Sequence, residues 1–447
     1  MSDKTLTVTT RQAAVGQGGL MTADVVLDSA GYARRLAYAF DCGSFNRERL
    51  YQAIESIGTP FLDILFISHL DADHVNGVDL LLAKRHVETV ILPCLDALSA
   101  TVIVCRALSG VGLTGDFEDF LDDPVRWLGV RGVKRVVFIK RDGGVEPMSP
   151  GGQPPDLDPD SRYWVDTVNE EDPRIAVSIA SRGIRQSAQR RQLPSGQVEV
   201  LVAQAEVEIE LVVGAAVTPP EMITWILLPY VHPFEEDSIE LFRAAVRGVL
   251  RVPDGEKPAA RSFMRRLLKC LVDPSLRAKL RACYGVLASD HNEVSLSLYS
   301  GPRPSNNDGW DIRGTSRWFS FDRRYGGPIV SSRFRVPPQR FVQPRPAWLC
   351  TGDANLKLQR TRGSWLTRFG PLLEQVGVFV LPHHGSALNL SDEILDGLRD
   401  AAHIVCAGAS RERHPHPDVL GRFSELGLGL WQVSEQEESV FGMTVSR

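Results

Sequence analysis

The stretch that most constrains this chain is a short apolar segment followed at once by four side chains that can bind metal ions. Residues 64–67 read Ile-Leu-Phe-Ile and predict a buried strand. Imidazole and carboxylate ligands together suit Zn²⁺, Mn²⁺ or Fe²⁺ better than a thiolate-rich structural zinc site does. A polar turn is the alternative, since Asp favours turns, but a turn does not require two His and two Asp at this spacing. The four residues are His69, Asp71, Asp73 and His74.

The composition is that of an ordinary globular protein. Of the 447 residues, 43% are hydrophobic and 23% are charged, and the net charge of −5 predicts no general affinity for nucleic acid or anionic lipid. The seven cysteines form no CxxC pair, which argues against a cysteine zinc site and fits core residues in a reducing cytosol. The N-terminus has no apolar signal-peptide core, and no apolar run approaches the roughly 20 residues that span a bilayer. We therefore expect a cytoplasmic protein without membrane contact.

Segments of strand and helix character alternate in the N-terminal part of the chain. Residues 36–41 predict a strand, and residues 47–57 place Leu50 and Ile54 on one face of a helix. A further helix is expected from about Val78. This alternation predicts an α/β layered domain.

The centre of the chain, residues 106–285, fits this alternation less well and is interpreted as an insertion or cap. Regular structure returns at residues 292–299 with an alternating strand. We therefore divide the chain into the N-terminal half of one domain (1–105), the insertion, and the C-terminal half (286–447). The basic stretch 261–283 either binds an acidic partner or is a solvated helix face.

Three further strand-like segments each lead to a side chain that can bind a metal. Strand ends that face one edge of a sheet can converge on one site. A hydrolytic site with two metals about 3.5–4 Å apart needs roughly six to seven ligands and a bridging water. We expect the three segments to supply the ligands that the first loop lacks. The residues concerned are Asp353, His383, His384 and His416.

The order of these motifs resembles the metallo-β-lactamase fold superfamily, and more narrowly the soluble hydrolase domain of ComEC-type competence proteins and its stand-alone relatives. The resemblance spans most of the chain and implies a four-layer αββα sandwich of the α/β class with a large central insertion. The matching pieces are Val15-Gly-Gln-Gly18, Asp41-Cys-Gly43, Ser68-His-Leu-Asp-Ala-Asp-His74, Asn292-x-x-Ser-Leu296, Thr351-Gly-Asp-Ala354, Leu381-Pro-His-His-Gly-Ser386 and His416-Pro417.

The resemblance also implies a centre that holds one or two ions of Zn²⁺ or Mn²⁺. His69 and Asp71 would bind the first ion. Asp73 and His74 would bind the second, and Asp353 would bridge the two.

The remaining roles follow from the same resemblance. His383 or His384 would complete the ligand set, and His416 would lie near the substrate or behind the ligands. Asp73 would also orient the attacking water, so Asp73 and His416 are the catalytic candidates.

The metal loop departs from the wider superfamily at one position. The superfamily loop reads His-x-His-x-Asp-His, and its second His is Asp71 here, as is usual in the ComEC-like branch. A carboxylate at this position favours Mn²⁺ beside Zn²⁺. The ligand that other branches carry before the Gly-Asp motif has no clear match, and His291 and His232 are the nearest candidates.

The segment 303–345 carries the clearest indication of a substrate. It holds nine Arg, no Lys and three Asp, with aromatic residues between them. Arginines with stacking aromatics are typical of surfaces that bind a phosphate backbone and its bases. The alternative is an ordinary long loop whose aromatics pack it down.

Three functions remain open at this point. The first is a metal-dependent phosphodiesterase or nuclease that acts on nucleic acid or nucleotides. The second is a hydrolase of a small ester, lactone or amide on the same metal site, since one fold hosts many reactions. The third is a non-catalytic binding subunit, against which the intact set of metal-binding side chains argues.

Overall fold

The computed structural model describes most of the two ends of the chain and parts of its centre. The described residues are 4–29, 32–94, 119–120, 123–140, 162–165, 174–181, 184–204, 207–212, 225–232, 236–252, 266, 273–284, 295–303, 309–314, 334–336, 345–410 and 413–447.

Within these residues the fold is mixed α/β and contains two sheets of ten strands each. The first sheet has the order β14 (Asp311–Gly314), β20 (Phe441–Ser446), β1 (Lys4–Gln12), β2 (Gly18–Ser29), β3 (Tyr32–Ser44), β4 (Phe61–Phe66), β5 (His86–Pro93), β6 (Arg135–Ile139), β10 (Gly196–Ala203), β9 (Gln189–Leu193).

The second sheet has the order β15 (Phe334–Val336), β19 (Leu430–Val433), β18 (Ala402–Cys406), β17 (Val376–Val380), β16 (Ala347–Cys350), β13 (Leu296–Pro302), β12 (Trp225–Val231), β11 (Glu208–Val212), β8 (Ala176–Ala180), β7 (Arg162–Val165). Strands β3, β4, β5 and β6 are parallel to one another, and so are β16, β17, β18 and β19. The carboxyl ends of parallel strands lie at the same edge of a sheet. The segments that carry the predicted metal-binding side chains follow such ends, after β4, β16 and β17.

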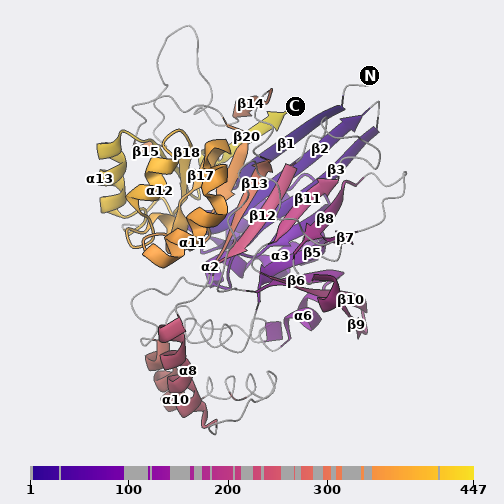
Figure 1. Ribbon diagram of the computed structural model, residues 1–447, viewed down its shortest axis with the longest axis vertical. Coiled ribbons are helices and arrows are strands. Elements are labelled where there is room, and N and C mark those ends of the chain that lie inside the picture. The colour runs from indigo at the N-terminus through magenta and orange to yellow at the C-terminus, as the bar shows by residue number, and fades with distance from the viewer. Residues whose placement is uncertain are drawn as a thin grey trace.

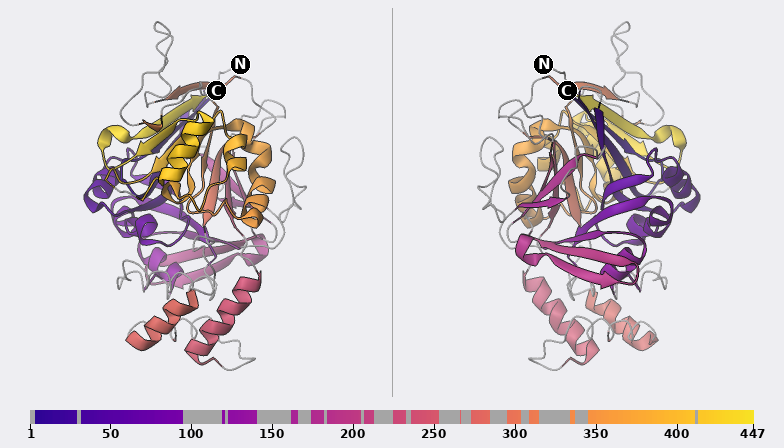
Figure 2. Two further views of the ribbon diagram at one scale, coloured as in Figure 1. Left: turned by 90° about the vertical axis from the view of Figure 1, so that its left-hand side faces the viewer. Right: turned by 90° about the vertical axis from the view of Figure 1, so that its right-hand side faces the viewer.

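The two sheets share one hydrophobic core, which contains Phe66 of the first sheet and Trp225 and Trp348 of the second. A second apolar cluster joins the first sheet to α1 (Arg47–Glu55) and α3 (Val78–Lys84). A third joins the second sheet to α11 (Gln359–Phe369), α12 (Asp392–Gly397) and α13 (Pro417–Leu426). Figure 1 and Figure 2 show these three helices together beside the second sheet.

The remaining helices are short or lie at the ends of the sheets. They are α2 (Ala72–Val75), α6 (Pro124–Val130), α7 (Ile184–Ser187), α8 (Glu236–Leu250), α10 (Pro274–Tyr284) and the 3₁₀ turns η3 (Gly370–Gln375), η4 (Pro382–Gly385) and η5 (Glu437–Ser439). No helix in the described ranges is long and apolar enough to cross a bilayer.

Local sequence signals explain where the first helices begin. Asn46 caps α1 by accepting a hydrogen bond from the Arg49 amide, as N-cap residues do. The helix buries Leu50 and Ile54, the face that the sequence predicts, and it ends at Glu55 rather than at residue 57. The expected helix from Val78 is α3.

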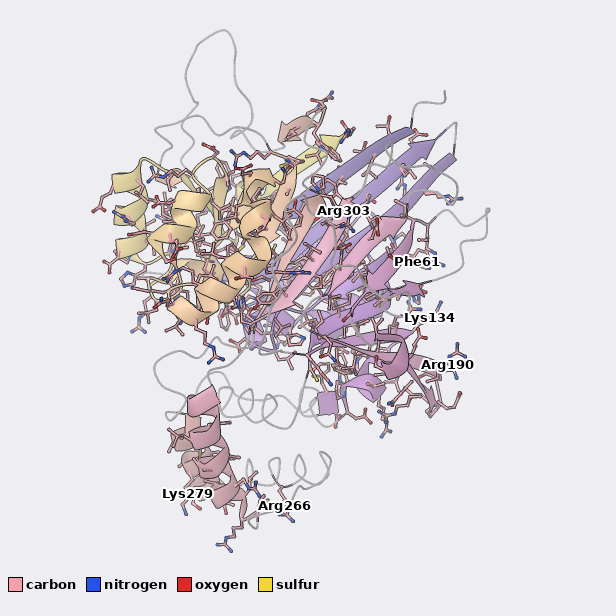
Figure 3. All side chains as sticks on the ribbon, viewed as in Figure 1. Phe61, Lys134, Arg190, Arg266, Lys279 and Arg303 are labelled. Atoms are coloured by element: carbon pink, nitrogen blue, oxygen red, sulfur yellow. The ribbon has the colours of Figure 1, made fainter. Side chains whose placement is uncertain are left out.

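Strands from residues 106–285 lie in both sheets. β6, β9 and β10 extend the first sheet, and β7, β8, β11 and β12 extend the second. Helices α8 and α10 pack against each other, and their buried residues belong to the same apolar cluster as α1 and α3. Figure 3 labels Lys279 and Arg266 in this part of the molecule. The boundaries at residues 105 and 285 stay a prediction.

Asp63 on β4 makes one stability prediction. Burial raises the pKa of its carboxyl to about 6, although the Ala37 amide donates to Oδ2 at 2.7 Å. The folded state therefore binds more protons than the unfolded state between pH 4 and 6, and stability falls as the pH rises through this window. Asp63→Asn removes the charge and keeps an acceptor. We expect the variant to be more stable than the wild type by about 1–2 kcal/mol at pH 7.5.

Urea unfolding of both proteins at pH 7.5 and at pH 4.5 measures this difference. The gain should shrink at the lower pH, where the wild-type carboxyl is protonated in the folded state. A gain that is independent of pH would contradict the assignment.

Candidate metal centre

The predicted metal-binding side chains come from three loops, which follow β4, β16 and β17 and bring their side chains together. Asp353 lies at the centre of the group. Its Oδ2 is 3.3 Å from His69 Nε2 and 3.9 Å from His383 Nε2, and its Oδ1 is 3.6 Å from His74 Nε2. The two oxygens of one carboxylate thus face histidines from different parts of the chain.

Two other carboxylates lie in the same group. Asp73 Oδ2 is 3.2 Å from His384 Nε2, and Asp71 Oδ2 is 3.5 Å from His69 Nε2. The structure therefore brings together all seven residues for which the sequence predicts metal binding. Two sets of three donor atoms lie within 4.8 Å of one another: His69, His74 and Asp353, and Asp73, His74 and His384.

The Nε2 atoms of this group fit a bound cation. Those of His69, His74 and His384 are buried and make no hydrogen bond of normal geometry to any described residue. Buried polar atoms without such a bond are rare in proteins. A divalent cation would satisfy all three, because neutral imidazole nitrogen and carboxylate oxygen are its usual ligands.

The other ring nitrogen of each histidine is already engaged. A metal-binding histidine commonly uses its second nitrogen to hydrogen-bond an acceptor, which fixes the orientation of the ring. The Nδ1 contacts are His69 with Ser68 Oγ at 2.8 Å, His74 with Asp41 Oδ2 at 2.8 Å, His383 with Asn389 Oδ1 at 3.1 Å and His384 with the Cys406 carbonyl at 2.8 Å. All four rings therefore direct Nε2 toward the centre.

The electrostatics of the group keep its buried carboxylates charged. Burial alone would raise the pKa of the Asp353 carboxyl, but His383 and His69 outweigh it and hold that pKa well below its usual range. Burial also opposes ionisation of Asp73, and His384 and His74 again lower its pKa below the usual range. These carboxylates are therefore ionised at neutral pH.

The histidine pKa values shift in the complementary direction. Burial lowers the pKa of His69, but Asp353 and Asp71 outweigh it and raise that pKa well above 6.5. His384 has a raised pKa as well, since Asp73 and Asp353 outweigh its burial. Metal binding would replace these protons, so it should release protons from the protein.

The backbone that carries the histidine pair is strained. His383 and His384 both have left-handed φ angles, 46° and 54°. Such conformations cost free energy in a residue with a side chain and persist where the surroundings enforce them. The His383 amide donates to the Gly352 carbonyl at 3.0 Å, which ties the pair to the loop that bears Asp353.

Glycine is required in the Asp353 loop. Gly352 has φ 52°, and a Cβ there would lie 2.2 Å from Ser295 Oγ. That same hydroxyl accepts a hydrogen bond from the Asp353 amide at 2.9 Å. The Thr-Gly-Asp motif thus places its aspartate through a close approach that only glycine allows.

His416, the second predicted catalytic residue, is not placed among these side chains. Its ring caps α13, where Nδ1 accepts a hydrogen bond from the Asp418 amide at 3.2 Å. His414 is the histidine of this loop that approaches the centre: its ring lies 5.7 Å from that of His383 and 6.3 Å from that of His384. No sequence signal singled out His414, although it belongs to the same His-Pro-His-Pro motif as His416. A catalytic role for His416 stays a prediction.

Other supporting residues had weaker sequence signals. Asp41 and Ser68 belong to motifs quoted above, but spacing alone assigned them no role. Gln17, from the first glycine-rich turn, donates to Asp73 Oδ2 at 3.3 Å. Asn389 donates to the Asp353 carbonyl at 3.2 Å as well as contacting His383.

The candidates for the additional ligand do not fill that role in the described residues. His232 is buried, its Nε2 is 3.3 Å from Ser297 Oγ, and burial lowers its pKa to about 3. It belongs to neither set of clustered donor atoms. His291 lies outside the described residues.

A small cavity lies beside the clustered ligands. Its volume is about 30 Å³, which is room for one water molecule or one ion. The wall includes His74, Asp353, His384, Asp41 and Cys406. The cavity thus belongs to the metal centre.

The arginine-rich segment 303–345 is described only in part. Arg303 pairs with Glu208, and Arg345 pairs with Asp400 at 2.7 Å. Figure 3 labels Arg303 against the second sheet, where its pairing is part of the fold. These two arginines serve structural contacts, and the nucleic-acid role of the segment stays a prediction.

The donor atoms of this group, rather than similarity to known proteins, indicate what the centre can do chemically. Histidine and aspartate side chains from both halves of the chain meet with their ligand atoms facing one another. No family model and no curated protein matches this chain.

Proposed function

We propose that this chain is a metal-dependent hydrolase of the metallo-β-lactamase fold, related to the ComEC-type hydrolase domain. The order of its motifs supports this proposal. So does the presence of two sheets that share one core, each with an outer helical cluster, which is the pattern of a four-layer αββα sandwich. The strands of residues 106–285 would be elaborations at the far ends of both sheets.

The observation that carries the proposal is the set of buried Nε2 atoms that face carboxylates without normal hydrogen bonds. The residues present would hold one or two ions of Zn²⁺ or Mn²⁺. His69 Nε2 faces Oδ2 of both Asp353 and Asp71, whereas His74 Nε2 faces Oδ1 of Asp353. Asp73 and His384 extend the second group.

A bound divalent cation supplies Lewis acidity and makes water a stronger nucleophile at neutral pH. The protein's own contribution is to hold the ligand atoms in place before the reaction. Asp73 is oriented by Gln17 and His384, and its ionised carboxylate can accept a hydrogen bond from the attacking water. Burial of the centre keeps the effective dielectric constant low, which strengthens its interaction with a developing negative charge.

The substrate class that fits best is a phosphodiester in a nucleic acid or nucleotide. Cations in this centre would neutralise a phosphoryl oxygen, and the arginine-rich segment, where it lies outside the described residues, is suited to bind further phosphates. Hydrolysis of a small neutral ester, lactone or amide is the competing reaction on the same ligands.

The test combines metal analysis of the purified protein with hydrolysis assays. Substrates are a chromogenic phosphodiester, single- and double-stranded DNA and RNA, and a neutral ester, each with added Zn²⁺ or Mn²⁺. Asp73→Ala should lower the metal-dependent rate at least about 100-fold. Asp63→Asn, a buried carboxylate change away from the centre, is the matched control and should retain the rate.

The outcomes separate the alternatives. Cleavage of nucleic acid whose affinity falls steeply with added salt supports the phosphodiesterase. Turnover of the ester alone, insensitive to salt, favours the second reaction. Full activity of Asp73→Ala would sink the mechanism, and a protein that binds neither metal would leave only the binding-subunit interpretation.

A further inference from the structure

Asp41 belongs to neither set of clustered donor atoms in the described residues, but it lines the small cavity beside them. It stands at the end of β3, has a left-handed φ of 57° and is 2% exposed. Its carboxylate accepts three hydrogen bonds: from the Ser68 amide to Oδ1 at 2.7 Å, and from the Ser68 hydroxyl and His74 Nδ1 to Oδ2 at 2.7 and 2.8 Å. A buried carboxylate with three donors is an acceptor only.

The direction of the next hydrogen bond follows from proton counting. The Ser68 hydroxyl has a single proton, which it donates to Asp41. Its oxygen must therefore accept from His69 Nδ1, which lies 2.8 Å away. His69 and His74 thus both carry a proton on Nδ1, so their Nε2 atoms are the ones available to a metal.

We propose that Asp41 is a positioning residue that sets the proton position of two metal-binding histidines at once, His74 directly and His69 through Ser68. The inference rests on the proposed metal centre and extends it. His74 Nε2 faces Oδ1 of Asp353 and His69 Nε2 faces Oδ2. One buried carboxylate thereby orders the imidazoles that face the two oxygens of Asp353.

An isosteric change at position 41 tests this chain of bonds. Asparagine tolerates a left-handed φ, but Asp41→Asn presents an amide donor where Oδ2 accepted two protons. The new amide then donates one proton to the Ser68 oxygen and the other to His74 Nδ1. The Ser68 hydroxyl in turn donates its own proton to His69 Nδ1. Both rings would move their proton to Nε2, where it blocks metal binding.

Ser68→Ala separates the two arms of the network. It removes the acceptor for His69 and leaves the bond from His74 to Asp41 in place. Two control variants match these changes in chemistry. Asp63→Asn removes a buried carboxylate that accepts a hydrogen bond from a backbone amide. Ser297→Ala removes the hydroxyl that contacts His232, a histidine outside the centre.

The first readout is the affinity for Zn²⁺, measured by competition with a chromogenic chelator. We expect Asp41→Asn to lose at least about 100-fold and Ser68→Ala about 10–100-fold, the range found when the hydrogen-bond partner of a ligand is removed. The second readout is nitrogen NMR of the histidine rings in metal-free protein, which distinguishes Nδ1–H from Nε2–H. The wild type should show Nδ1–H on His69 and His74.

The two readouts separate positioning from a merely structural role. In Asp41→Asn both rings should change to Nε2–H, and in Ser68→Ala only His69 should change. Unchanged ring protonation in Ser68→Ala, or a Zn²⁺ loss in both variants no larger than in the controls, overturns the proposal. If Asp41→Asn does not fold by circular dichroism, Ser68→Ala decides alone. Neither readout uses a substrate, so failure of the proposed hydrolysis would be seen separately.

Discussion

Asp353→Ala is expected to abolish tight metal binding and to lower the metal-dependent rate by about 1,000-fold or more. The reason is that both oxygens of this carboxylate are used: Oδ2 faces His69 and His383, and Oδ1 faces His74. In the proposed centre Asp353 would hold metal through both oxygens, and alanine offers neither. Metal content after dialysis and initial rates with saturating Mn²⁺ or Zn²⁺ measure the two effects.

Asp353→Asn is the matched variant, because it keeps the shape of the side chain and one oxygen. It should retain part of the metal and part of the rate, on the order of 10–100-fold below the wild type. Equal metal content in Asp353→Ala and the wild type would contradict the proposal that Asp353 is a metal ligand.

His384→Ala is expected to reduce the rate about 100–1,000-fold, whereas His383→Ala should reduce it only about 10-fold. His384 is buried, with Nε2 3.2 Å from Asp73 Oδ2. The side chain of His383 is 28% exposed, and its Nε2 lies 3.9 Å from Asp353 Oδ2. The sequence left open which of the two is the ligand, and this geometry favours His384.

The two variants control for each other. Both positions have left-handed φ angles, so alanine carries a similar backbone cost at each. Rates and Zn²⁺ stoichiometry should be measured side by side, with thermal unfolding in chelator to compare stability. A loss at His383→Ala as large as that at His384→Ala would show that both histidines are ligands.

Much of the local structure follows from short-range patterns. The apolar run at 64–67 continues β4 into the metal loop, and Leu50 and Ile54 identify the buried face of α1. These features depend on contacts within a few residues, which a linear sequence records directly. The central region was harder, because strands such as β6 and β10 pair with each other across a long interval that contains other strands. Periodicity predicts a strand without naming its partner.

The choice between His414 and His416 illustrates the same limit. Both stand in one His-Pro-His-Pro motif, and composition and spacing treat them alike. His416 is used to cap α13, because its ring accepts from the Asp418 amide. The ring of His414 instead packs against those of His383 and His384. Only the path of the backbone around this loop separates the two roles.

What the sequence determined by itself is the donor set: His69, Asp71, Asp73 and His74 in one loop, and Asp353 with the histidine pair after later strands. Side-chain chemistry and spacing after a strand are local properties, so they can be read without a fold. The tertiary structure alone decided that the two oxygens of Asp353 face different histidines. It also decided that Asp41, 33 positions before His74 in the chain, lies within hydrogen-bond distance of that ring. Such contacts join residues far apart in sequence, and their geometry exists only once the strand ends of both sheets have been brought together.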